Sequence, residues 1–223
     1  LIIQEKEENL VSVIPGKGKK SFVVNGNCLD VDVIFPALHG TYGEDGTIQG
    51  LFEMLDIPYV GCTHISSALT MDKEKTKQIW ESANLPVVPY ICARKFEAET
   101  EQGLSALEEK SKNQFGYPVF VKPCCAGSSV GASKADNKEE FEKSVKEAFS
   151  WDDKILIEPF VKAREIECSV IGNEKQISFI PCEILPTHEF YDYEAKYKDP
   201  DGASFSIPAN LSEEQIAQVK SIA

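Results

Sequence analysis

Apolar and polar positions near the start of the chain predict a strand, a loop, a helix and a second strand. Residues 31–36 (Val-Asp-Val-Ile-Phe-Pro) have the pattern of a buried strand, and the glycine-rich segment 39–46 predicts a loop. Residues 47–55 carry apolar side chains at helical spacing, and residues 57–60 are extended again. This succession is typical of a parallel sheet.

The rest of the chain predicts a mixture of helices and strands. Residues 72–84 predict a helix that Asp72 caps, with Ile79, Trp80 and Ala83 on one apolar face. The polar stretch 186–210 predicts a functional loop or lid. The other predicted elements are strands at 88–92, 117–121, 154–158, 165–172 and 176–181, and helices at about 97–111, from a capping box at 136–139 to 149, and from a capping box at 212–215.

Charge and composition limit the classes of function. The 223 residues include 23 Lys and Arg against 36 Asp and Glu, a net charge of −13, which argues against a general nucleic-acid binder. Hydrophobic residues make up 42% of the chain, enough for a core. Any anion site must therefore rest on a few cations brought together locally.

Targeting segments and cysteine spacing add little chemistry. We expect neither a membrane segment nor a signal peptide, because no apolar run has the required length and no cationic start precedes one. The seven cysteines include no C-x-x-C pair, and buried reduced thiols are favoured over a metal or disulfide role. The first residue is Leu, so we expect a piece of a longer protein.

Two groups of lysines are candidate anion ligands. Lys73, Lys75 and Lys77 crowd the start of a predicted helix, where they either attract an anion or are solvated and offset by acidic neighbours. Lys122 ends a predicted strand, and the Gly-Ser-Ser-Val-Gly loop at 127–131 follows it. Such a loop can turn backbone N–H groups toward phosphate, although Gly-Ser-Ser also forms ordinary turns, and it is not a Walker A loop.

An adenine-binding pattern follows. The apolar strand 155–157 ends in Glu158, and an apolar stretch through Val161 comes next. An adenine needs an apolar slot, one acceptor and one backbone N–H, which a strand-to-linker hinge supplies. Glu165 and Glu167 share a strand face, where one could reach a ribose or both could line an exposed edge. Lys196 and Tyr197 in the predicted lid could close over a phosphate, or the segment could bind a partner.

Together these segments resemble the D-alanine–D-alanine ligases of the ATP-grasp superfamily. The resemblance spans about residues 31–207 and follows the family's motif order. The motifs are Leu-His-Gly at 38–40, Gly-Glu-Asp-Gly-Thr-Ile-Gln-Gly at 43–50, Ile-Pro-Tyr-Val-Gly-Cys at 57–62, Met-Asp-Lys at 71–73, Val-Lys-Pro at 121–123, Gly-Ser-Ser-Val-Gly at 127–131, Arg-Glu-Ile-Glu at 164–167 and the segment 189–197.

The resemblance implies a fold and a domain plan. The expected class is α/β (α+β), an ATP-grasp fold preceded by a parallel-sheet N-terminal domain and incomplete at both ends. Residues 1–62 would be the remainder of an N-terminal substrate domain, and 63–158 the central ATP-grasp subdomain. Residues 159–223 would begin the C-terminal subdomain and include a lid at about 186–208.

The implied activity is a ligase that joins two D-alanines through a C–N bond, with ATP converted to ADP and phosphate through an acyl phosphate, for peptidoglycan synthesis. The implied cofactors are ATP and Mg²⁺ or Mn²⁺. The implied setting is a homodimer in a bacterial cytoplasm, with no nucleic acid or membrane as partner. Alternatives are a D-alanine–D-serine ligase and a catalytically dead nucleotide-binding fragment; the D-lactate variant is disfavoured by the lid tyrosines.

Site residues carry over by position. Lys73, Lys122 and Lys196 would hold phosphates, and the catalytic set would include Ser128, Lys196 and Tyr197. His39, Ser128 and Tyr197 would contact the amino-acid substrates. The nucleotide would be bound by Lys73, Lys122, Ser128, Ser129, Glu158, Phe160, Val161, Glu165 and Lys196. No metal ligand is expected in this chain; the family's Arg-x-Asp and Glu-x-Asn ligands are expected beyond Ala223, and Cys124-Cys125 receives no role.

Overall fold

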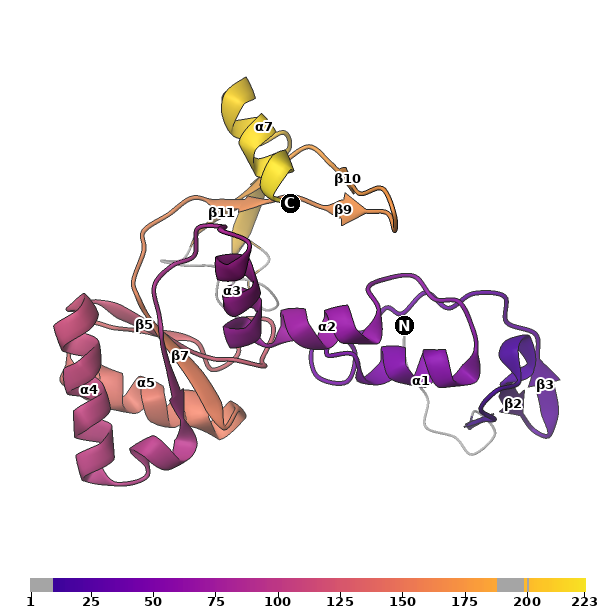
Figure 1. Ribbon diagram of the computed structural model, residues 1–223, viewed down its shortest axis with the longest axis horizontal. Helices are drawn as coiled ribbons and strands as arrows, with labels where there is room; N and C mark the ends of the chain where they lie inside the picture. The colour runs from indigo at the N-terminus through magenta and orange to yellow at the C-terminus, as the bar shows by residue number, and fades with distance from the viewer. Residues whose placement is uncertain (1–9, 188–198, 200) are drawn as a thin grey trace. The chain divides into compact units, whose positions relative to one another are not determined.

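A computed structural model describes residues 10–187, 199 and 201–223 (Figure 1). The chain divides into two compact units, residues 1–76 and 77–223. Each unit has its own secondary structure, and each is described by itself. Within the described part, no helix has both the length and the apolar character needed to cross a membrane. The predicted domain borders at residues 62 and 158 stay predictions.

The first unit contains an antiparallel sheet that the sequence pattern did not reveal. Strands β1 (Val11–Val13), β2 (Phe22–Val24) and β3 (Asn27–Leu29) pair in the order β1-β2-β3, with the short helix η2 (Gly18–Lys20) between the first two. Asn25 and Gly26 connect β2 to β3 with φ angles of 51° and 78°. Positive φ at both central residues is typical of a tight hairpin turn, for which Asn-Gly is a strong sequence signal.

The rest of the first unit confirms part of the predicted succession. Helix α1 (Thr47–Leu55) forms where expected, and a second helix, α2 (His64–Met71), follows. The Thr63 side chain caps α2 by accepting a hydrogen bond from the Ser66 N–H. The predicted strand 31–36 is wrong in extent, because it is reduced to one parallel bridge between Ile34 and Tyr59. In the described part of this unit, no neighbouring residues extend the bridge, so residues 31–36 do not form a strand ladder.

Helix α3 (Lys73–Ser82) begins in the first unit and ends in the second. The predicted cap is confirmed, since Oδ1 of Asp72 accepts hydrogen bonds from the Glu74 and Lys75 N–H groups, at 3.0 and 3.2 Å. The predicted apolar face is wrong. Ile79 and Trp80 are 46% and 48% exposed, whereas Lys77 is the buried residue of the helix.

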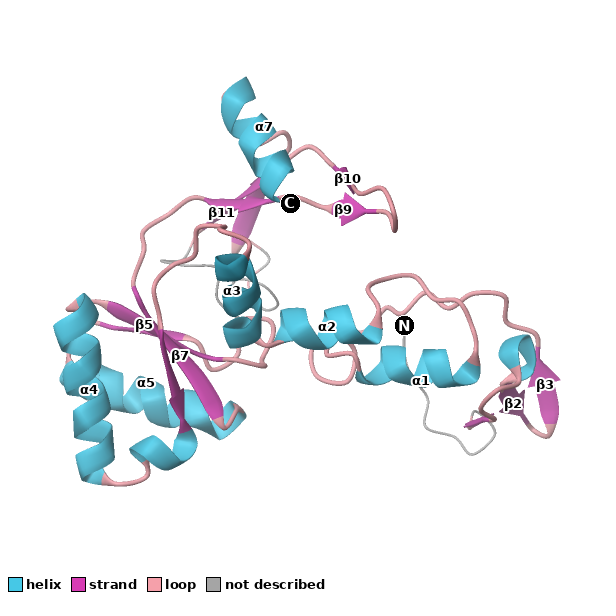
Figure 2. Ribbon diagram, viewed as in Figure 1, coloured by secondary structure: helices cyan, strands magenta, loops and turns pink. Residues whose placement is uncertain are grey.

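The second unit is built on an antiparallel sheet with the strand order β4-β7-β5-β6. Figure 2 labels β5 and β7, the two central strands. The strands are β4 (Ile91–Arg94), β7 (Lys154–Pro159), β5 (Val119–Pro123) and β6 (Ser133–Ala135). Helices α4 (Glu101–Phe115) and α5 (Lys138–Trp151) pack against the sheet, and the short helix η3 (Lys95–Ala98) precedes α4. The core between them includes Phe141 and Val145 of α5 and Val121, Ile155 and Ile157 of the sheet, all at most 1% exposed.

The capping box predicted at 136–139 is wrong, and α5 is capped by a single side chain one residue later. Asn137 is the N-cap and accepts a hydrogen bond from the Glu140 N–H at 3.0 Å. The Glu140 carboxylate accepts hydrogen bonds from the Asp136 N–H and from the Asn137 side chain. A capping box would need this carboxylate on the backbone N–H of the N-cap residue itself.

A second sheet has the order β12-β11-β8. Its strands are β8 (Glu165–Glu167), β11 (Cys182–Pro186) and β12 (Ala203–Ser206), and the hairpin β9 (Val170–Ile171) and β10 (Ile177–Ser178) lies between β8 and β11 in sequence. Strand β12 corrects the prediction that 186–210 is all loop; residues 188–198 and 200 lie outside the described residues. Helix α7 (Glu213–Ile222) opens on the predicted capping box of Ser212 and Gln215.

Candidate nucleotide-binding site

The Glu158 carboxylate lies between two lysines. Its Oε2 is 2.6 Å from Nζ of Lys122, and its Oε1 is 2.7 Å from Nζ of Lys77. Strands β5 and β7 bring the first pair together, because Phe120 lies opposite Glu158 and Lys122 lies two residues further along the same strand face. The Glu158 side chain is 7% exposed, so its charge is buried and balanced by these partners.

A pocket of about 160 Å³ opens beside this carboxylate. Its walls are apolar apart from Glu158, and its lining residues are Val88, Phe120, Glu158, Pro159, Phe160 and Val161. The rings of Phe120 and Phe160 are tilted by 40° with centroids 6.3 Å apart, and Nζ of Lys134 lies 5.0 Å from the Phe160 centroid. Apolar walls with one buried acceptor match the requirements of a flat base that carries an amino group.

The Gly-Ser-Ser loop after β5 has an unusual backbone. Ser128 and Ser129 have φ angles of 54° and 58°, and Gly131 follows with 67°. Two successive non-glycine residues in the left-handed region cost roughly 1–3 kcal/mol each, so the surrounding structure must hold them there. Gly131 is required at its position, since a Cβ atom there would lie 2.6 Å from Cδ1 of Trp151. Loops with such backbones can present N–H groups to an anion.

Cys124 and Cys125 anchor the base of this loop. The Cys124 N–H donates to the Lys154 carbonyl at 2.9 Å, and the Cys125 N–H donates to the Asp152 carboxylate at 2.7 Å. A hydrogen bond with Cys92 and burial both raise the pKa of the Cys124 thiol. All seven cysteines are free thiols, but only Cys124 is buried, so the expected burial of the thiols is wrong for the other six. The hydrogen bonds at Cys124 and Cys125 come from backbone N–H groups, so the two side chains still have no assigned role.

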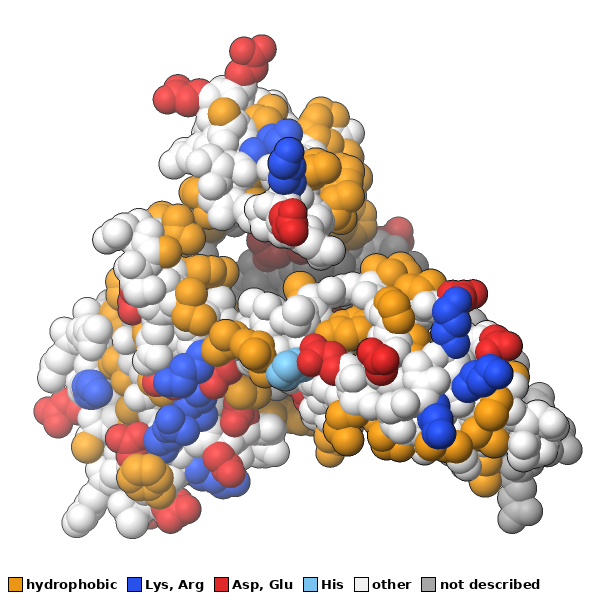
Figure 3. Space-filling view, turned by 45° about the vertical axis from the view of Figure 1, so that its right-hand side comes forward, with side chains coloured by type: hydrophobic (Ala, Val, Ile, Leu, Met, Phe, Trp, Pro, Cys, Tyr) orange, Lys and Arg blue, Asp and Glu red, His pale blue; other side chains and the backbone are white. Residues whose placement is uncertain are grey.

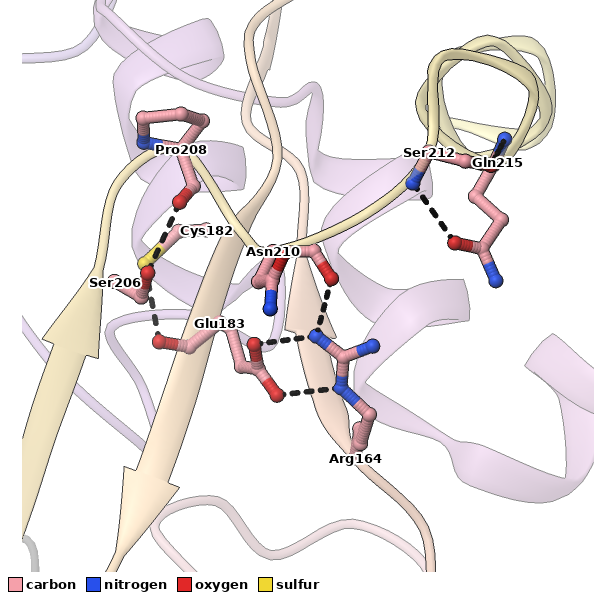
Figure 4. A network of polar contacts seen from close by, with 8 residues as sticks. All are labelled: Arg164, Cys182, Glu183, Ser206, Pro208, Asn210, Ser212 and Gln215. Carbon is pink, nitrogen blue, oxygen red and sulfur yellow. Dashed lines mark hydrogen bonds and ion pairs between the residues drawn. The ribbon is translucent and has the colours of Figure 1, made fainter.

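Glu165 is the first residue of β8 and is half-buried. The preceding residue, Arg164, donates two hydrogen bonds of 2.6 Å to the Glu183 carboxylate and a third of 2.8 Å to the Asn210 carbonyl (Figure 4). Hydrogen bonding to Arg164 lowers the pKa of Glu183. Because β8 and β11 are also paired, this network fixes the strand on which Glu165 lies.

The structure brings together four of the residues predicted from the sequence, namely Lys122, Glu158, Phe160 and Val161. The remaining predicted residues are spread over the chain. Ser128 and Ser129 lie in the loop after β5, Lys73 begins α3, and Glu165 begins β8. His39 lies in the first unit and is exposed, with its Nδ1 atom 3.9 Å from Oε1 of Glu44. Lys196 and Tyr197 lie outside the described residues.

Sequence reasoning missed Lys77 as a site residue. It was one of a group of lysines at the start of a helix, which solvation explains equally well. In the structure Lys77 pairs with Glu158 and donates to the Val88 carbonyl at 2.8 Å, so both of its partners line the pocket. On the face drawn in Figure 3, basic and acidic side chains are interspersed. Among the described residues, no group of three His, Cys, Asp or Glu side chains is placed to hold a metal ion.

Two family profiles match the chain. The profile described as "D-ala D-ala ligase N-terminus" matches residues 3–62, and "D-ala D-ala ligase C-terminus" matches residues 79–223. The fold is that of an ATP-grasp protein, as its match to solved ligases shows. The chain belongs to the D-alanine–D-alanine ligase family.

Curated relatives of the chain support the same family. The chain is 49% identical to the D-alanine–D-alanine ligase of Treponema denticola and 44% identical to that of Treponema pallidum. Both matches cover all of this chain but only 61% and 56% of those proteins, so the chain spans somewhat more than half of their length.

Solved ligase structures also match this chain in fold. The ligase from Coxiella burnetii matches with a TM-score of 0.76 at 32% identity, over 95% of this chain and 54% of that one. The VanG D-Ala:D-Ser ligase from Enterococcus faecalis matches with a TM-score of 0.77 at 33% identity, over 92% of this chain and 57% of that one.

Proposed function

We propose that the protein to which this chain belongs joins two D-alanines to D-alanyl-D-alanine, with ATP converted to ADP and phosphate, for peptidoglycan synthesis. The observation that supports this most directly is the Lys122–Glu158 pair beside an apolar pocket, in a member of this family. The pair provides a phosphate ligand and a base acceptor within one side-chain contact. We propose a homodimer in a bacterial cytoplasm, which light scattering and cell fractionation would test.

The pocket suggests how the nucleotide is oriented. Glu158 accepts a hydrogen bond from the exocyclic amine of adenine, the Val161 backbone donates to the ring, and Phe160 packs against the base. Glu165 binds the ribose. Lys73, Lys122 and Lys196 then hold the phosphates, with Ser128 and Ser129 in the strained loop nearby. Cations spread over several positions suit a phosphoryl group whose charge is shared among its oxygens.

The reaction proceeds in two steps, phosphorylation of the first D-alanine and then formation of the peptide bond. The carboxylate oxygen of the first D-alanine forms a bond to the γ-phosphorus as the bond to the ADP oxygen breaks, which gives an acyl phosphate. The amine of the second D-alanine then attacks the acyl carbon and gives one proton to solvent, and phosphate leaves with the C–O bond electrons. Ser128 and Tyr197, with His39 beside the amino acids, orient the substrates, and a closed lid would exclude water that could hydrolyse the intermediate.

A divalent cation, Mg²⁺ or Mn²⁺, neutralises phosphate charge in reactions of this class. The described residues do not by themselves fit such an ion, since they hold no cluster of three metal-ligating side chains.

We propose D-alanine as the second substrate, because the curated relatives at 44–49% identity are D-alanine–D-alanine ligases. Identity to the solved structures does not separate it from D-serine, since the D-Ala:D-Ser ligase is 33% identical and the D-alanine–D-alanine ligase from Coxiella burnetii is 32% identical. A coupled assay for ADP release by the intact gene product, with D-alanine alone and with D-alanine plus D-serine, tests this. We expect turnover with D-alanine alone. Turnover only with D-serine added would support the D-serine ligase, and nucleotide binding without any turnover would support a catalytically dead module.

A further inference from the structure

The Lys77 ammonium group is held on three sides. Its Nζ is 2.7 Å from Oε1 of Glu158, donates to the Val88 carbonyl at 2.8 Å, and lies 5.2 Å from the centroid of the Tyr90 ring. Its side chain is 11% exposed. A buried lysine with a carboxylate, a carbonyl and an aromatic face around it has little freedom to move toward a ligand.

Lys122 is placed differently on the same carboxylate. Its Nζ meets the other oxygen of Glu158 at 2.6 Å, and its side chain is twice as exposed, at 22%. If Lys122 binds a phosphate, the phosphate oxygens compete with Glu158 for its donors. A buried carboxylate that loses its counter-ion is strongly destabilised, so Glu158 needs a second cation that stays in place.

Lys77 also connects two walls of the pocket. Glu158 ends the buried part of β7, and Val88 belongs to the segment between α3 and β4. Both line the pocket, and the Lys77 side chain contacts one residue of each wall. Loss of the Lys77 side chain would remove the contacts that hold the Glu158 carboxylate and the Val88 carbonyl in place.

We propose that Lys77 is a positioning residue for recognition of the base: it keeps the Glu158 carboxylate and the Val88 wall in place for adenine while Lys122 serves the phosphates. The inference rests on the proposed function, since it assumes that the pocket takes ATP. A fixed carboxylate favours adenine, which offers an amino group, over guanine, which presents a carbonyl oxygen to the same acceptor.

The test compares ATP and GTP affinity by calorimetry in the intact gene product. Lys77→Gln keeps a hydrogen-bond donor but removes the charge, and Lys77→Met removes both. We expect both variants to bind ATP about 10-fold more weakly, with GTP affinity nearly unchanged, so that the ATP-over-GTP ratio falls. Lys77→Arg, which keeps the charge, should restore most of the ratio. Lys110→Gln, at an exposed position of helix α4, is the matched control and should leave the ratio unchanged.

An unchanged ratio in folded Lys77 variants, or an equal loss for both nucleotides, would overturn the proposal, because a purely structural role lowers both affinities alike. If Lys77→Met does not fold, Lys77→Met is combined with Glu158→Gln and compared with Glu158→Gln alone. No further change in the ratio is expected, and a further fall would contradict the proposal. A wild-type protein that binds no ATP would instead refute the proposed function itself.

Discussion

Arg164, the residue before strand β8, is joined to Glu183 of the neighbouring strand β11 by two hydrogen bonds of 2.6 Å. The same guanidinium donates to the Asn210 carbonyl, at the end of the segment that leads into α7 (Figure 4). Planar two-point pairing of this kind fixes geometry as well as charge. The pair therefore holds in register the strand that presents Glu165.

Glu183→Gln should lower stability at neutral pH and have less effect in acid. The Arg164 hydrogen bonds lower the pKa of Glu183 in the folded protein. The Glu183 carboxylate therefore stabilises the fold fully at a pH above its pKa in the unfolded chain, near 4.3. This stabilisation is lost as the pH falls through the lower pKa that Glu183 has in the folded protein. Thermal unfolding at neutral pH and below about pH 4 should show the difference between variant and wild type narrowing. Glu109→Gln, at an exposed position of α4, is the control.

Lys122→Ala should weaken ATP binding about 10- to 100-fold, as expected for a lost charge-assisted hydrogen bond to phosphate. The loss should be smaller for adenosine, which has no phosphate. Calorimetry with both ligands measures the difference. Lys95→Ala removes a surface lysine that lies 3.3 Å from Asp153 and should have no effect. Unchanged ATP affinity would show that the phosphate assignment is mistaken.

Phe160→Ala should weaken ATP and adenosine binding by similar factors, about 10-fold, because stacking of a base on an aromatic ring contributes roughly 1–3 kcal/mol. The Phe160 ring lines the pocket and contacts Phe120, so its removal opens one wall. Phe96→Ala, at a side chain that is 71% exposed, is the matched control. Full retention of adenosine affinity would place the base elsewhere.

Gly131→Ala should lower the free energy of unfolding by about 1–2 kcal/mol, because the residue has a left-handed φ, and it should also weaken ATP binding. The added Cβ would lie 2.6 Å from Trp151 and 3.0 Å from Cγ of Pro123, so the loop must shift.

Gly50→Ala is the opposite case. This glycine lies inside α1 with open space around it, and alanine should stabilise by about 0.5–1 kcal/mol. Chemical denaturation with nucleotide titration measures both effects.

Sequence reasoning succeeded where the local signal was strong. The buried run of β7, the capping box of α7 and the Asp72 cap were predicted from short segments, and each is confirmed. The walls of the pocket beside Glu158 could be anticipated because Glu158 and Phe160 are two residues apart on one segment, whereas adenine as its ligand stays a prediction. In these cases the determining contacts lie within a few residues of one another.

The failures have a different physical cause. Lys77 is buried by a partner far along the chain, Glu158, so no local pattern distinguishes it from a solvated lysine. Strand β12 is paired with β11 across the predicted loop, and the bridge at Ile34 lacks the further pairing that would extend it. Helix α2 was missed because its capping pair, Thr63 and Ser66, lacks the glutamate or glutamine of a full box.

The burial of Glu158 with its two lysines has a consequence for how salt acts on the protein. Dissolved ions largely screen the interaction between exposed charges more than about 10 Å apart at 0.1 M, but they screen a buried pair much less. The chain carries a net charge of −13, so its exterior repels an approaching polyanion, while the enclosed lysines attract it only at short range. Raising the ionic strength should therefore speed the arrival of ATP and leave its departure nearly unchanged, the reverse of the behaviour of a protein that attracts anions over its whole surface.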